Sequence, residues 1–368
     1  MDDATPGHTR TGDFSDGFTF HGRWQEFLPI AATNLLLTIV TLGIYRFWAK
    51  TRERRYLWSR TQFIDERLEW AGTGKEMFIG FLIVMAIFVP LLVVVQFGVQ
   101  ALAFRGHALA AGVLGLGTYL AIFYLVGLAL FRALRYRLSR TYWHGIRGGS
   151  DDGGWNYGVS ALWKYVVGFL TFGLLIPWTM VTLWRERWSK MSFGPFAFET
   201  GDSPPTRGLI GRYLLIYATP VVWGLIVAVL GMGTIFTAMT EANPRATSGM
   251  AGMFILSVFS FYILFSLLSL AYYAAFMRKV IGELGIGDLR FSFEARTMDW
   301  VMLILGNFAL VIFTLGFGIM YLGYRHWSFY VRHLKVQGEV DLATLTQSTT
   351  RLRSDAEGLA DAFDIGAI

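Results

Sequence analysis

The chain has 368 residues, of which 54% are hydrophobic and 16% charged, with a formal net charge of +6 and no cysteine. Charged residues make up about a quarter of an ordinary soluble domain, so this composition excludes that class, and the lack of cysteine excludes disulfides and thiolate metal sites. The arginines cluster at the ends of apolar runs, which is typical of the positive-inside bias of membrane proteins and argues against a nucleic-acid partner.

Residues 1–17 form a polar, acidic segment without the positive stretch of a cleaved signal peptide. Residues 18–104 open with alternating apolar and polar positions, which indicate a short strand. An apolar run at 27–45 follows, and then a run at 77–104 without Asp, Glu, Lys or Arg. The second run exceeds the roughly 20 residues that a helix needs to cross the hydrocarbon core.

Residues 108–236 contain two further uncharged runs, at 108–131 and 213–236, which flank a more polar run at 165–184. Because backbone in lipid must satisfy its own hydrogen bonds, such runs predict membrane-spanning helices. Alternation predicts further short strands at the membrane surface between the helices, at 142–146, 193–198, 289–293 and 334–336.

Residues 250–338 contain a fourth uncharged run at 250–277 and an apolar run at 300–324. Residues 339–368 are polar and of mixed charge, and predict a cytoplasmic tail. The fold class that we expect is therefore an α-helical polytopic integral membrane protein with short surface strands.

A Thr-x-Gly sequence followed by aromatic and basic residues occurs three times in the chain. An offset of 273 positions aligns Asn34 and Arg52 with Asn307 and Arg325, and an offset of 130 places Lys164 opposite Asn34. We therefore expect an internal triple repeat with a diverged middle copy. The repeated threonines and glycines are Thr41, Gly43, Thr171, Gly173, Thr314 and Gly316.

Two topologies remain open. If all seven apolar runs cross the membrane, two basic clusters lie outside the cytoplasm, against the positive-inside bias. If only the four uncharged runs cross, every basic loop and the C-terminus are cytoplasmic. The three Thr-x-Gly segments would then be re-entrant or interfacial and would bend near the glycine. The run at 300–324 is nevertheless long and apolar enough to span alone.

Asn34 and Asn307 lie inside apolar runs, where an unpaired amide is costly. They would either line a solute path, together with the six repeated threonines and glycines, or bond between packed helices. The aromatic and basic residues beyond each glycine would anchor the chain at the headgroup level or bind membrane lipids, anionic ones among them. These lipid-headgroup candidates are Trp48, Arg52, Arg54, Arg55, Trp178, Arg185 and Arg325.

The sequence contains no nucleophile–base constellation, zinc spacing or nucleotide-binding loop, so we expect no enzyme, cofactor or metal. The string Asn34…Thr41-Leu42-Gly43-Ile44-Tyr45…Trp48-Ala49-Lys50, within residues 18–74, resembles the YjgN family of bacterial membrane proteins, also called DUF898. The resemblance implies a bacterial inner-membrane location and brings no established activity.

The sequence leaves the oligomeric state open. It supports two hypotheses about function. The first is transport or sensing of a small solute along a path lined by the repeat segments, because transporters often build their binding sites from broken helices. The alternative is a lipid-binding or scaffolding protein that acts through its basic-aromatic cytoplasmic junctions.

Overall fold

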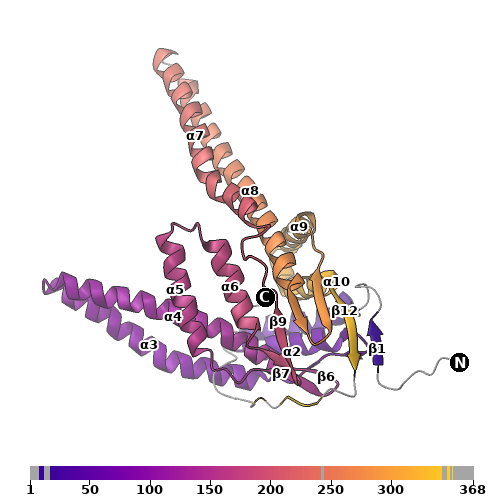
Figure 1. Ribbon diagram of the computed structural model, residues 1–368. Helices are drawn as coiled ribbons and strands as arrows, with labels where there is room; N and C mark the ends of the chain where they lie inside the picture. The colour runs from indigo at the N-terminus through magenta and orange to yellow at the C-terminus, as the bar shows by residue number, and fades with distance from the viewer. Residues whose placement is uncertain (1–7, 12–16, 242–243, 342–345, 349, 351–368) are drawn as a thin grey trace.

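The computed structural model describes residues 8–11, 17–241, 244–341, 346–348 and 350, so most of the segments 1–17 and 339–368 lies outside the described residues. Within these described ranges, four helices are long and apolar enough to cross a membrane. They are α3 (Gly74–Phe104), α4 (Ala108–Arg140), α7 (Ile210–Glu241) and α8 (Pro244–Gly282). They form two long hairpins, α3–α4 and α7–α8, which diverge from the strands (Figure 1). The four uncharged runs are therefore helices, as expected.

Three short hairpins occupy the more polar apolar runs. Hairpin 1 consists of α1 (Trp24–Val40) and α2 (Arg46–Ser59). Hairpin 2 consists of α5 (Trp155–Leu170) and α6 (Ile176–Trp188). Hairpin 3 consists of α9 (Thr297–Phe313), the 3₁₀ helix η1 (Phe317–Tyr321) and α10 (Leu322–His333). In each, the first helix ends at the Thr-x-Gly sequence, so none of these runs is one continuous helix.

The strands form two antiparallel sheets. The larger has the order β1-β12-β11-β10-β9-β8-β7-β6-β5 and the smaller the order β2-β3-β4. The bounds are β1 (His8–Thr11), β2 (Phe18–Phe20), β3 (Thr61–Phe63), β4 (Glu66–Arg67), β5 (Glu69–Trp70), β6 (Thr141–Trp143), β7 (Ile146–Gly149), β8 (Ser192–Phe193), β9 (Phe196–Thr200), β10 (Leu284–Ile286), β11 (Leu289–Phe293) and β12 (Leu334–Asp341).

The segments 142–146 and 193–198 are not single strands, as the alternation predicts, because each contains the two-residue turn of a β-hairpin and the strand ends that flank it. His144 and Gly145 have φ of 50° and 68°, and Gly194 has φ of 56°. Such left-handed residues suit the two-residue turns that join antiparallel strands. Alternation therefore located the strands but could not show where the chain reverses.

Strand pairing recurs in one register at three places. Phe18 pairs with Phe63, Gly148 with Phe193, and Phe291 with Val336. These pairs are related by the same offsets of 130 and 273 positions that align the Thr-x-Gly segments. In each case the two paired strands flank one short hairpin, so the strands close its open end.

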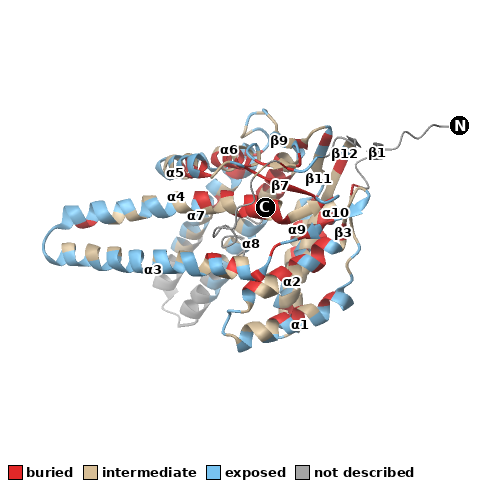
Figure 2. Cartoon of the chain, turned by 90° about the horizontal axis from the view of Figure 1, so that it is seen from below, coloured by how far each residue is buried: buried red, intermediate tan, exposed pale blue. Residues whose placement is uncertain are grey.

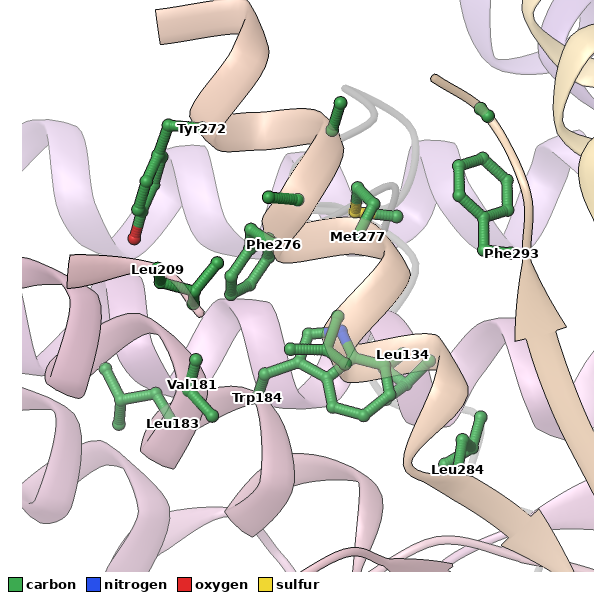
Figure 3. Packing of buried hydrophobic residues seen from close by; sticks show 14 of the residues in the cluster. Leu134, Val181, Leu183, Trp184, Leu209, Tyr272, Phe276, Met277, Leu284 and Phe293 are labelled. Carbon is green, nitrogen blue, oxygen red and sulfur yellow. The ribbon is translucent and has the colours of Figure 1, made fainter. Parts of the chain in front are cut away.

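The core lies where the helices meet the sheet, and the outer parts of α3 and α4 are exposed (Figure 2). One buried cluster joins hairpin 2 to α4, α8 and hairpin 3, and contains Val181, Trp184, Met277 and Phe293 (Figure 3). A second cluster packs hairpin 1 against α3, α4 and the strands. Trp58 stacks on Trp327 with ring centroids 4.1 Å apart, so hairpins 1 and 3 pack directly together.

Candidate functional site

The apex of each short hairpin is a helix end of one kind. The glycine N–H donates to the carbonyl five residues back, from Gly43 to Thr38, from Gly173 to Gly168 and from Gly316 to Val311. The preceding residue donates to the carbonyl three residues back, which completes a Schellman motif. That preceding residue also has a left-handed φ of 50° to 52° in all three hairpins.

A bulky apolar side chain occupies this left-handed position in every apex. The residues are Leu42, Phe172 and Leu315, with exposures of 93%, 85% and 90%. Glycine is the residue that adopts this conformation without steric cost. Each apex therefore combines a strained backbone with an almost completely exposed apolar side chain.

The threonine hydroxyl of the Thr-x-Gly sequence forms hydrogen bonds with backbone groups of the apex. In hairpin 1 the Thr41 hydroxyl donates to Leu37 O at 2.7 Å and accepts from Tyr45 N–H at 2.9 Å. In hairpin 3 the Thr314 hydroxyl donates to Leu310 O and accepts from Gly318 N–H, both at 2.6 Å. The repeated threonines and glycines thus build the turn itself.

The two asparagines bond across their own hairpins. Arg52 Nη1 donates to Asn34 Oδ1 at 3.2 Å, and Arg325 Nε donates to Asn307 Oδ1 at 2.7 Å. Asn34 is buried, and its Nδ2 donates to Ala49 O at 3.1 Å. Both amides therefore connect helices within a hairpin, in the manner of membrane asparagines that serve packing.

Hairpin 2 uses a different polar pair at the corresponding level. The buried Lys164 donates to Glu186 Oε2 at 2.7 Å, and Ser160 Oγ donates to the same oxygen at 2.6 Å. The ammonium lies about 6 Å from the rings of Trp163 and Trp178. The middle hairpin thus replaces an amide–guanidinium bond with an ion pair.

The remaining arginine candidates lie in different environments. Arg54 is buried with its guanidinium over the Trp70 ring, whereas Arg55 is exposed. Arg185 is held by Glu283 beyond the end of α8, with Nη2 2.7 Å from Oε2. Of these three, only Arg55 presents its charge fully at the surface. Trp48 packs on Phe78 at a ring distance of 5.3 Å, which fixes hairpin 1 on α3.

Glu283 is the centre of a small polar network at the C-terminal end of α8. Its carboxylate also accepts from Lys279 Nζ at 3.0 Å and from Ser203 Oγ. Burial alone would raise the pKa of this carboxyl, but the hydrogen bonds from Ser203, Arg185 and Lys279 outweigh it and bring the pKa below 4.5. The network therefore ties α6 to α8 in the charged form.

A cleft of about 710 Å³ is lined mostly by hairpin 3, with Trp24 of α1 at one side, and we call it the α9–α10 cleft. Helix α9 contributes the apolar Met302 and Leu303. On α10, Arg325 and Arg332 line it. They are seven residues apart, two helical turns, and so lie on one face of the helix.

Of the residues that line the cleft, Arg325 is a candidate from the sequence, and the others are found only in the structure. Trp24 and Arg332 are 308 positions apart in the chain. They line the same cleft only because hairpins 1 and 3 pack together. The spacing of Tyr321, Arg325, Ser328 and Arg332 on one helical face was the available signal. This spacing can be recognised only when it is known that a new helix, α10, begins at Leu322.

These features define a class of protein. Four span-length apolar helices and exposed apolar apices, next to basic and aromatic junctions, are those of an integral membrane protein. The chain belongs to the family described as bacterial protein of unknown function (DUF898), which matches residues 15–362. No solved structure matches the chain.

Three relatives carry the name inner membrane protein YjgN. The one from Salmonella typhimurium (strain LT2) is 22% identical over 379 residues, which cover 91% of this chain and 92% of that protein. The one from Escherichia coli O157:H7 is 29% identical over 36% of this chain and 30% of its own length. The one from Escherichia coli K12 is 34% identical over 22% and 21%. With the apolar helices, these relatives support an inner-membrane location.

Proposed function

We propose that this is a lipid-binding inner-membrane protein whose three short hairpins enter the cytoplasmic leaflet without crossing it. In this arrangement α3, α4, α7 and α8 cross the membrane, and the sheets and C-terminus lie in the cytoplasm. The three hairpins are copies of one unit, supported by their common strand register and common apex. Their role is to bind lipids of that leaflet at the basic and aromatic junctions.

The apex is the observation that carries this proposal. A left-handed L-residue costs roughly 1–2 kcal/mol, and keeping a leucine or phenylalanine side chain in water forgoes about 1.5–3 kcal/mol. Leu42, Phe172 and Leu315 incur both penalties if the apices are in water. Hydrocarbon around the apex removes the larger penalty, that of an apolar side chain in water. It also explains why bulky apolar residues stand at this position.

The polar groups of the apex support the same placement. Backbone that enters hydrocarbon must have its N–H and C=O groups bonded within the protein. The Schellman bonds and the Thr41 and Thr314 hydroxyls provide those partners.

A solute path is the competing proposal, and the volume of the α9–α10 cleft would suit a small solute. Against it, the Asn34 and Asn307 amides are engaged within their own hairpins. The path would be favoured if Asn34→Ala with Asn307→Ala abolished transport by a protein that remains folded.

The test is the accessibility of single cysteines, which the cysteine-free chain makes simple. Leu42→Cys, Phe172→Cys and Leu315→Cys should resist a membrane-impermeant maleimide in both intact cells and inside-out vesicles. They should react with the same maleimide after denaturation in detergent, because the thiolate is the reactive form and a thiol in hydrocarbon stays protonated.

Two exposed positions serve as matched controls. Arg105→Cys, between α3 and α4, should label in intact cells, and Ser59→Cys, at the end of α2, only in inside-out vesicles. Labelling of the apex cysteines in intact cells, at the rate of Arg105→Cys, would show that the short hairpins reach the periplasm and would overturn the proposal.

A further inference from the structure

The α9–α10 cleft has the chemistry of a phospholipid site, and we propose that it binds one phospholipid of the cytoplasmic leaflet through its phosphate. This inference rests on the proposed function, because it places hairpin 3 in that leaflet. It adds a specific ligand class and two phosphate-binding residues, Arg325 and Arg332, which line the cleft from one face of α10.

The Arg325 guanidinium is held in a defined orientation. Its Nε donates to Asn307 Oδ1 at 2.7 Å, and its Nη2 lies against Gly306, where a Cβ would collide with it. Asn307 thus fixes the side chain through one nitrogen, and Gly306 gives the guanidinium room. A guanidinium held in this way presents donors in a planar fork that suits phosphate oxygens.

The charges facing the cleft favour an anion. Arg325 and Arg332 are opposed by one carboxylate, that of Asp299. Asp299 accepts from the Arg296 backbone N–H at 2.7 Å and lies 3.8 Å from His333 Nε2. Part of its negative charge is therefore compensated by groups at the start of α9 and by His333. The two positive guanidinium groups outweigh the negative charge that remains.

The walls favour an amphiphile over free phosphate. Met302, Leu303 and Leu310 of α9 give the cleft an apolar wall, and Leu310, four residues before Thr314, lies nearest the apex. Trp24 is more than half exposed at its edge, as interfacial tryptophans are. Acyl chains can lie along the apolar wall while the phosphate meets the arginines.

The depth of Arg325 agrees with a headgroup position. Arg325 lies nine residues beyond Gly316, a rise of roughly 15 Å through η1 and the first turn of α10. Half the hydrocarbon core is also about 15 Å thick. An apex near the bilayer centre therefore puts this guanidinium at the level of lipid phosphates.

The test is native mass spectrometry of the purified full chain with phosphatidylglycerol. Arg325→Gln with Arg332→Gln should weaken binding of the first lipid by at least about tenfold, because the loss of even one charge-assisted hydrogen bond has about that effect. Arg67→Gln with Arg207→Gln removes the same charge from two exposed positions outside the cleft and should leave binding within about twofold of wild type.

Three further results distinguish a phospholipid site from free phosphate binding, from general charge attraction and from loss of the fold. Inorganic phosphate that displaces the lipid at equal concentration would overturn the assignment to a lipid. Equal weakening by both double variants would reduce it to general charge attraction and overturn the site. An unchanged melting temperature of Arg325→Gln with Arg332→Gln shows that the fold is intact. Lysine in place of glutamine at position 325 should then restore part of the lipid binding. The apex cysteines report leaflet entry independently, so failure of the cleft and failure of the proposed function are distinguishable.

Discussion

Arginine residues in similar sequence contexts have different roles in this protein. Arg52 and Arg325 each donate to an asparagine 18 residues earlier across the apex turn, and Arg185 pairs with Glu283, 98 residues away. Arg54 stacks on Trp70. Sequence alone predicted a basic cluster at the headgroups, because it shows where charges are but not which of them have partners.

Glu283 provides a prediction at this scale. Because its folded-state pKa is lowered, it contributes stability that is present above the ordinary carboxyl pKa and is lost as the pH falls below 4.5 through the folded value. Thermal unfolding in detergent should show this loss for the wild type. Glu283→Gln should be less stable at pH 7 and should lack that part of the acid dependence. An acid dependence equal to that of the wild type would show that Glu283 is not the group responsible.

The apex turn is the element on which the architecture depends. Gly43 has φ of +93°, and an added Cβ would meet no atom within 4 Å. Gly43→Ala should therefore lower the free energy of unfolding by roughly 1 kcal/mol through backbone strain alone.

Gly112→Ala is the matched control for that variant, because Gly112 also has open space but lies within α4. Alanine there should be neutral or stabilising by up to about 1 kcal/mol. Unfolding of both variants in mixed detergent micelles measures the difference. Equal effects at the two positions would show that the left-handed turn is not what holds the apex.

The elements differ in how far the sequence could predict them. The uncharged runs predicted α3, α4, α7 and α8, because that signal is local, and the bends at the Thr-x-Gly sequences were expected only in the four-crossing topology. The turn at His144 was missed because a non-glycine residue adopts a left-handed φ there. The cleft was missed because Trp24 and Arg332 meet only through the packing of hairpin 1 on hairpin 3.

At the scale of the whole molecule, the strands connect the hairpins. β1 pairs with β12, so the first and last described strands lie side by side at one edge of the larger sheet. Each short hairpin is closed by paired strands in a common register, while the long hairpins extend away (Figure 1). Hairpin 1 thus projects from the smaller sheet, and hairpins 2 and 3 project from the larger one.

Depth-dependent fluorescence quenching tests leaflet entry most directly. An environment-sensitive fluorophore on Leu42→Cys, Phe172→Cys or Leu315→Cys would be measured in vesicles with bromine or nitroxide quenchers at defined acyl-chain depths. We predict blue-shifted emission and strongest quenching by acyl-chain quenchers at all three apices. Emission typical of water, with quenching only by aqueous iodide, would contradict the account.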